Sequence, residues 1–178
     1  MSPERLFFAL WPSDEVRAAL VAERGLIAGE PSRPSHRLDL HMTLVFVGAL
    51  AADARACVDA VGEWVLGSPF VIRLDAIVEW PGSGPGRGMW CATAAEVPRQ
   101  LAELVGQLQN RLLRCGLQPE RRAYRPHVTL ARKAPSMVPQ PVDLLWQVDD
   151  FVLAASRSGR RPSYEVLQRW PLSLSSAP

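Results

Sequence analysis

The sequence contains one short pattern twice, and the second copy lies far along the chain from the first. Residues 41–44 read His-Met-Thr-Leu, and residues 127–130 read His-Val-Thr-Leu. Threonine occurs only at positions 43, 93 and 129, and the chain of 178 residues has three histidines. Random placement would give roughly 0.05 His-x-Thr patterns, and two copies about once per thousand shuffled chains, so the repeat is a signal.

Each copy lies in a segment whose composition favours a β-strand, residues 40–48 and residues 127–132. Residues i and i+2 of a strand point to the same face, so each histidine shares a face with its threonine. In a core, the imidazole and the hydroxyl would each need a buried partner. A single pair of this kind is more often structural, but two matched copies favour two walls of a catalytic cleft.

Two facing imidazoles with hydroxyls beside them suit displacement at phosphorus. One neutral histidine takes a proton from the attacking water, and the other, protonated, gives one to the leaving oxygen. By analogy with carboxylate pairs that admit a water, we expect a separation of about 6–9 Å. Thr43 and Thr129 would donate hydrogen bonds to the non-bridging oxygens. We therefore predict His41 and His127 as the catalytic pair, and which of them is the acid stays open.

A metal ion is not required for this reaction when the substrate is a strained cyclic phosphodiester. No cysteine lies within a few residues of His41 or His127, and the sequence has neither a His-x-Glu nor a His-x3-His pattern typical of zinc sites. We therefore expect neither a metal nor another cofactor. The third histidine, His36, follows a proline-rich loop, where we expect it to be solvated.

The chain resembles the 2H phosphoesterase superfamily, and within it the bacterial and archaeal RNA 2′,3′-cyclic phosphodiesterases, also called 2′-5′ RNA ligases. The resemblance covers nearly the whole chain, from a first strand and two motif regions to a terminal strand, at residues 5–12, 40–48, 125–132 and 164–172. It implies an α+β fold with two pseudo-symmetric lobes, each with an antiparallel sheet and helices, and an active-site cleft between them. Residues 1–178 would form a single 2H phosphoesterase domain.

The resemblance also implies an activity. Family members hydrolyse RNA 2′,3′-cyclic phosphate ends to 2′-phosphate ends without a metal, and in vitro they join tRNA halves through a 2′-5′ linkage. The family's catalytic residues correspond to His41, Thr43, His127 and Thr129, and a phosphate ligand corresponds to Arg132. Two alternatives stay open: a non-catalytic module that binds RNA ends, and a 2H enzyme for another cyclic phosphate or nucleotide, such as ADP-ribose cyclic phosphate.

Two residues need a particular backbone to reach the substrate. Arg132 and Phe46 each follow a motif threonine by three positions, so on an unbroken strand they face away from it. A bulge or the strand end must redirect Arg132 if it binds phosphate. For Phe46 we weigh two roles, a core residue and a cleft residue that stacks on a base.

Composition limits the partners and the location of the chain. The net charge of +2 argues against a broad surface that coats nucleic acid, so we expect contact with an RNA end or cyclic nucleotide to be local. The longest apolar run, residues 44–52, is far short of the ~18 residues of a membrane span. The three cysteines lack metal or redox spacing and read as small core residues in a reducing cytoplasm. We expect a cytoplasmic monomer without membrane contact.

Further periodicity and turn signals complete the predicted elements. Strands are expected at residues 5–11, 70–80, 89–94, 146–155 and 163–170, in addition to the two motif strands, and helices at residues 14–26, 51–66 and 97–114. Strands and helices are interleaved, with glycine and proline turns between several strands, which favours α+β architecture.

Overall fold

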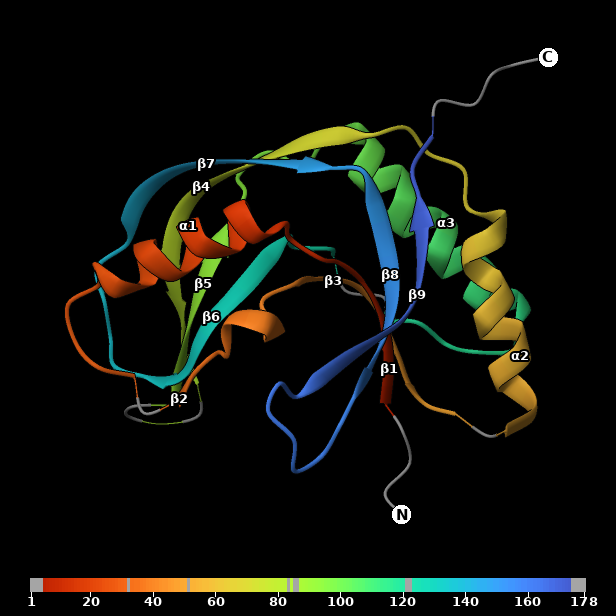
Figure 1. Cartoon of the computed structure of the whole chain (residues 1–178), viewed down its shortest axis with the longest axis horizontal. Helices are drawn as coiled ribbons and strands as arrows, with labels where there is room; N and C mark the ends of the chain where they lie inside the picture. The colour runs from red at the N-terminus through yellow and green to blue at the C-terminus, as the bar shows by residue number, and fades with distance from the viewer. Residues whose placement is uncertain are drawn as a thin grey trace.

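The computed structural model describes residues 5–31, 33–50, 52–82, 84, 87–120 and 123–173 (Figure 1). Its elements, in chain order, are β1 (Arg5–Leu10), α1 (Asp14–Gly25), β2 (Arg33–Pro34), η1 (Arg37–Asp39), β3 (Met42–Ala49), α2 (Ala52–Val61), η2 (Gly62–Trp64), β4 (Phe70–Trp80), β5 (Gly88–Thr93), α3 (Arg99–Arg114), β6 (His127–Ala134), β7 (Gln140–Val148), β8 (Asp150–Ser156) and β9 (Tyr164–Pro171). No described helix is long and apolar enough to cross a membrane.

The strands form an antiparallel sheet with two halves. The order is β7-β4-β5-β6-β3-β1-β8-β9, and β2 adds to β6. At the middle, β3 and β6 are joined through the single residue pair Met42 and Val128, whereas the strands inside each half pair over most of their length. The predicted α+β architecture is therefore confirmed, and the two motif strands meet at the junction of the halves.

Each half is covered by a helix that follows a strand of the other half. Helix α1 follows β1 but packs against β6 and β7, and helix α3 follows β5 but packs against β3, with α2 beside it (Figure 1). Helix α1 begins where predicted, because the hydroxyl of Ser13 accepts a hydrogen bond from the Val16 amide at 3.3 Å. Helix α3 buries a stripe of apolar side chains, namely Leu101, Leu104, Val105, Leu108 and Leu112.

The two motif strands carry bulges at matching positions. In β3, Leu44 and Val47 are skipped in the pairing with β1, and in β6, Leu130 and Lys133 are skipped in the pairing with β5. The second pair follows the first at the same spacing that separates the two histidines, 86 positions (127 minus 41). Because each bulge turns the residues beyond it relative to those before it, the repeat in sequence is also a repeat in backbone shape.

The C-terminal third departs from the predicted elements. The strand expected over residues 146–155 is two strands, β7 and β8, and Asp149 separates them. Strand β7 starts at Gln140, six positions before the predicted start at residue 146. Strand β7 is the edge of the sheet, where a proline such as Pro141 is tolerated.

The helix expected over residues 51–66 is shorter, because α2 ends at Val61 and the chain continues as η2, where Gly62 makes a close contact. A Cβ on Gly62 would lie 2.3 Å from the Trp170 ring, so the backbone packs directly against the indole. The tight approach brings β9 close to the end of α2.

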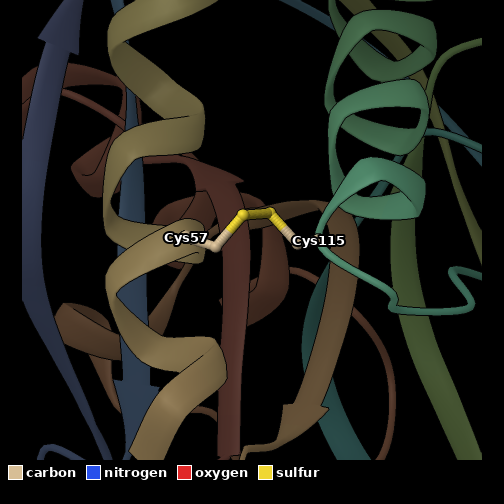
Figure 2. The surroundings of a disulfide bond; sticks show 2 residues. All are labelled: Cys57 and Cys115. Atoms are coloured by element: carbon tan, nitrogen blue, oxygen red, sulfur yellow. A yellow bond between two sulfur atoms is a disulfide. The ribbon is translucent and has the colours of Figure 1, made fainter.

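The prediction for the cysteines is correct for one of the three. Cys91 in β5 is a buried free thiol, but Cys57 and Cys115 form a disulfide between α2 and the end of α3 (Figure 2). Their Cα atoms are 5.8 Å apart, although 58 positions separate them in the chain. The expectation was wrong because it rested on local spacing, whereas the packing of two distant helices brings the thiols together.

Candidate active site

A cavity of about 360 Å³ opens where β3 and β6 meet. All six residues singled out from the sequence line it: His41, Thr43, Phe46, His127, Thr129 and Arg132. The motif strands thus supply both walls, one from each half of the sheet. Among the described residues, no group of three or more His, Cys, Asp or Glu side chains could hold a metal ion.

The two histidines are held in the same way. The Nδ1 atom of His41 lies 2.6 Å from the carbonyl oxygen of Asp39, and Nδ1 of His127 lies 2.8 Å from the carbonyl oxygen of Arg125. A carbonyl only accepts, so each Nδ1 carries a proton and donates it. In the neutral ring, Nε2 is then the atom that can exchange a proton with a substrate.

Aromatic rings surround His41. The ring of Trp11 stacks on it at 5.3 Å between centroids with 9° between planes, while Phe7 and Tyr164 both lie 4.9 Å away. Burial lowers the pKa of His41 from its usual 6.5 to about 4, although the carbonyl and the charge of Asp39 act to raise it. In the free protein His41 is therefore neutral near pH 7.

His127 has a different environment. Its ring lies 4.3 Å from Trp80, and the guanidinium of Arg125 lies 5.0 Å from the centroid of the same indole. Burial, followed by the charges of Arg132 and Arg125, lowers the pKa of His127 below its usual value, against the effect of its hydrogen bond to a carbonyl. The repeat thus places one imidazole in an aromatic cage and the other beside cations.

The bulges bring Phe46 and Arg132 to the cavity. Thr129 pairs with Cys91 and Ala131 with Trp90, so Leu130 is the extra residue between Thr129 and Arg132. This is the bulge that the sequence required if Arg132 was to share a wall with Thr129. The side chain of Phe46 is 60% exposed, which assigns it to the cavity wall rather than to the core.

Several lining residues were not predicted from the sequence. Arg5, Arg33 and Arg161 also line the cavity, and of the described residues along it only Asp39 is acidic. The signal for a cationic wall was present only as an excess of arginine spread along the chain. His36, expected to be solvated, is half-buried at the cavity, and its Nδ1 accepts a hydrogen bond from the Leu38 amide at 3.3 Å.

The chain is similar to known proteins over nearly its full length. The model of the 2′-5′ RNA ligase superfamily matches residues 12–159. An RNA 2′,3′-cyclic phosphodiesterase of Escherichia coli is 31% identical, with 96% of this chain and 98% of that protein covered. One from Thermus thermophilus is 32% identical, with 94% and 90% covered.

Solved structures agree with this result. The crystal structure of E. coli LigT complexed with 3′-AMP has a TM-score of 0.82 and 27% identity, and the match covers 97% of this chain and 100% of that one. A repeated His-x-Thr strand, a cavity between two half-sheets and these matches lead to one assignment. The chain belongs to the 2′-5′ RNA ligase superfamily.

Proposed function

We propose that this chain hydrolyses the 2′,3′-cyclic phosphate end of RNA to a 2′-phosphate end, with His41 and His127 as an acid–base pair. One observation carries the proposal. Two histidines from different halves of the sheet line one cavity, and each uses Nδ1 on a backbone carbonyl so that Nε2 is left for proton transfer. The names of the relatives support the same reaction.

The reaction balances with these groups alone. One neutral imidazole takes a proton from water as the water oxygen bonds to phosphorus. The bond from phosphorus to the 3′ oxygen breaks, and the other imidazole, as the imidazolium, gives that oxygen a proton. The products are a 2′-phosphate and a free 3′-hydroxyl. When the 5′-hydroxyl of another RNA end replaces water, the same steps form a 2′-5′ linkage.

The remaining lining residues hold the phosphate. We assign the Thr43 and Thr129 hydroxyls and the Arg132 guanidinium to its non-bridging oxygens, where negative charge accumulates. The exposed ring of Phe46 offers a stacking surface for the base that carries the cyclic phosphate. No residue in this assignment requires a cofactor.

A product assay on an oligonucleotide with a 2′,3′-cyclic phosphate end tests the proposal. The wild-type chain should convert it to the 2′-phosphate in the presence of EDTA, and His41→Ala and His127→Ala should each lower kcat by about a hundredfold or more. Near wild-type turnover by either folded variant would reject the assignment.

The same assay separates the alternatives. Binding without conversion would identify an RNA-end binding module, and loss of activity in EDTA would identify a metal mechanism. Faster turnover of ADP-ribose cyclic phosphate than of the RNA end, measured in competition, would identify a 2H enzyme with another substrate.

The Cys57–Cys115 disulfide removes the argument from reduced cysteines for a cytoplasmic location, so we propose only that the chain works as a monomer. His41, Thr43, His127, Thr129 and Arg132 are brought to one cavity by the fold of a single chain, so the proposed reaction needs no residue from a second copy. Light scattering coupled to size-exclusion chromatography tests the monomer.

A further inference from the structure

Asp39 is a buried acid that the mechanism above does not use. Its side chain belongs to a residue that is only 8% exposed and lies at the end of η1, two positions before His41. Its carboxylate accepts hydrogen bonds from the backbone amide of Ser163 at 2.8 and 2.9 Å, one to each oxygen, and from the amide of Tyr164 at 3.1 Å. A buried carboxylate costs free energy unless such donors satisfy it.

These hydrogen bonds connect two segments that both touch His41. The carbonyl of Asp39 accepts the proton of Nδ1 of His41, and Tyr164, at the start of β9, presents its ring to His41 at 79° between planes. The carboxylate of Asp39 therefore ties the turn before β9 to the residue that orients the imidazole. His41 is held from the backbone on one side and from Tyr164 on another.

Among the residues that the structure describes, the other half of the repeat has no counterpart of this link. Arg125 precedes His127 by two positions and uses its carbonyl in the same way. Its side chain instead lies over the Trp80 ring. The backbone hydrogen bond is thus common to both histidines. The hydrogen bonds from the Asp39 carboxylate to the turn before β9, here called the carboxylate clamp, occur only beside His41.

We propose that Asp39 is a positioning residue that, through its carboxylate, holds the turn before β9 and with it the Tyr164 ring against His41. The inference rests on the proposed function, because the proposed function makes His41 a proton-transfer residue. The hydrogen bonds of the Asp39 carboxylate thereby fix the imidazole of His41 in one orientation before substrate binds. Such preorganisation raises the fraction of productive encounters.

The charge of Asp39 gives the clamp a measurable signature. Asp39 raises the pKa of His41, while Arg132 and His127, both on β6, lower it along with burial. Tyr164 contributes a neutral ring edge from β9. The other ionisable residues that the structure describes along the cavity are Arg5, Arg33, His36 and Arg161. Loss of the Asp39 charge should therefore lower the pKa of His41 further.

The first test compares Asp39→Asn with Asp143→Asn, which removes an exposed carboxylate paired with Arg73 at 2.8 Å away from the cavity. On a cyclic-phosphate oligonucleotide, Asp39→Asn should lower kcat by about ten- to a hundredfold with little change in KM, and should move the pH profile of kcat/KM to lower pH. Asp143→Asn should match the wild type. A wild-type kcat and pH profile in Asp39→Asn would overturn the proposal.

A double-mutant cycle tests the link through Tyr164. Tyr164→Leu removes the ring edge that contacts His41. If Asp39 acts through Tyr164, the variant with both substitutions should be as active as the less active of the two single variants. Losses that multiply would contradict the link.

Measurements without substrate separate this inference from the proposed function. In the wild type, the amides of Ser163 and Tyr164 should exchange slowly with solvent because a buried carboxylate accepts them. NMR titration should give a lower pKa for His41 in Asp39→Asn than in the wild type. Fast amide exchange in the wild type would overturn the inference, even if Asp39→Asn failed to fold. If the wild type hydrolyses no cyclic phosphate, but the amides of Ser163 and Tyr164 exchange slowly and the pKa of His41 is lower in Asp39→Asn, only the proposed function is overturned.

Discussion

Phe46 and Arg132 hold equivalent places on the two walls of the cavity, although one is apolar and the other charged. Each follows a motif threonine by three positions, and in each strand a leucine bulge lies between the two. The same backbone device therefore presents a ring from β3 and a guanidinium from β6. A pseudo-symmetric cavity becomes asymmetric at this pair, so its two walls can bind different parts of one nucleotide.

Truncation of these two residues should have different kinetic effects. Phe46→Ala should raise KM for a cyclic-phosphate oligonucleotide, since base stacking contributes about 1–3 kcal/mol, and should change kcat little. Arg132→Ala should lower kcat by about a hundredfold, because it removes a cation from the developing charge. Steady-state kinetics measure both, with the exposed Val138→Ala as control. Equal effects on KM and kcat in both variants would contradict the separate roles.

The pH dependence should reflect two depressed histidine pKa values. A lowered pKa means that the proton leaves at lower pH, so the protonated partner becomes scarce as pH rises. The pKa of His41 is about 4 and the pKa of His127 is also below 6.5. The bell-shaped profile of kcat/KM should therefore have its maximum below pH 6.5. A bound phosphate anion favours both imidazolium forms, so the kcat profile should lie at higher pH. A maximum of kcat/KM above pH 7 would contradict these directions.

The chain supplies a matched control for the motif threonines. Thr43→Val and Thr129→Val keep the shape of the side chain but remove a hydroxyl donor at the cavity, so each should lower kcat by about a hundredfold. Thr93, the third threonine, donates to the carbonyl of Ala76 at 3.3 Å and does not line the cavity. Thr93→Val should therefore retain kcat. Equal losses in all three variants would assign the motif hydroxyls a structural role.

Reduction of the disulfide should lower stability without lowering turnover. The bridge between Cys57 and Cys115 closes a loop of 58 positions, and its removal should cost up to about 4 kcal/mol of unfolding free energy. Neither cysteine lines the cavity, so kcat should be unchanged. Thermal unfolding with and without a reductant measures the first effect. Alkylation of three thiols in denatured, unreduced protein, rather than of Cys91 alone, would contradict the bridge.

The site was predictable from sequence to the extent that local backbone rules determine it. The period of two along a strand placed each histidine with its threonine, and the same rule stated that Arg132 needed a bulge. The aromatic cage of His41 was not predictable, because Trp11 and Tyr164 come from opposite ends of the chain. Such contacts follow from the order of strands in the sheet, which no local pattern encodes.

The misassigned elements have a similar explanation. Residues 146–155 contain two apolar stretches, and the acidic pair Asp149 and Asp150 between them does not by itself show that β7 and β8 lie in opposite halves of the sheet. The cysteine pair depends on how α2 packs on α3, and that contact joins segments 58 positions apart. In both cases tertiary packing, rather than residue preference, decides the structure.

Each half-sheet is covered by a helix that follows a strand of the other half, and this arrangement determines whether one half could be excised from the chain. Residues 70–148 form a continuous insert whose ends are neighbours, since Phe70 pairs with Val148. An insert with adjacent ends is ordinarily a candidate for excision or grafting. Here excision would remove α3 from β3 and strip α1 of the strands beneath it, so both fragments would expose apolar surface. Each wall of the cavity therefore depends on a helix that covers it from the other half, and the two half-sheets are not separable modules.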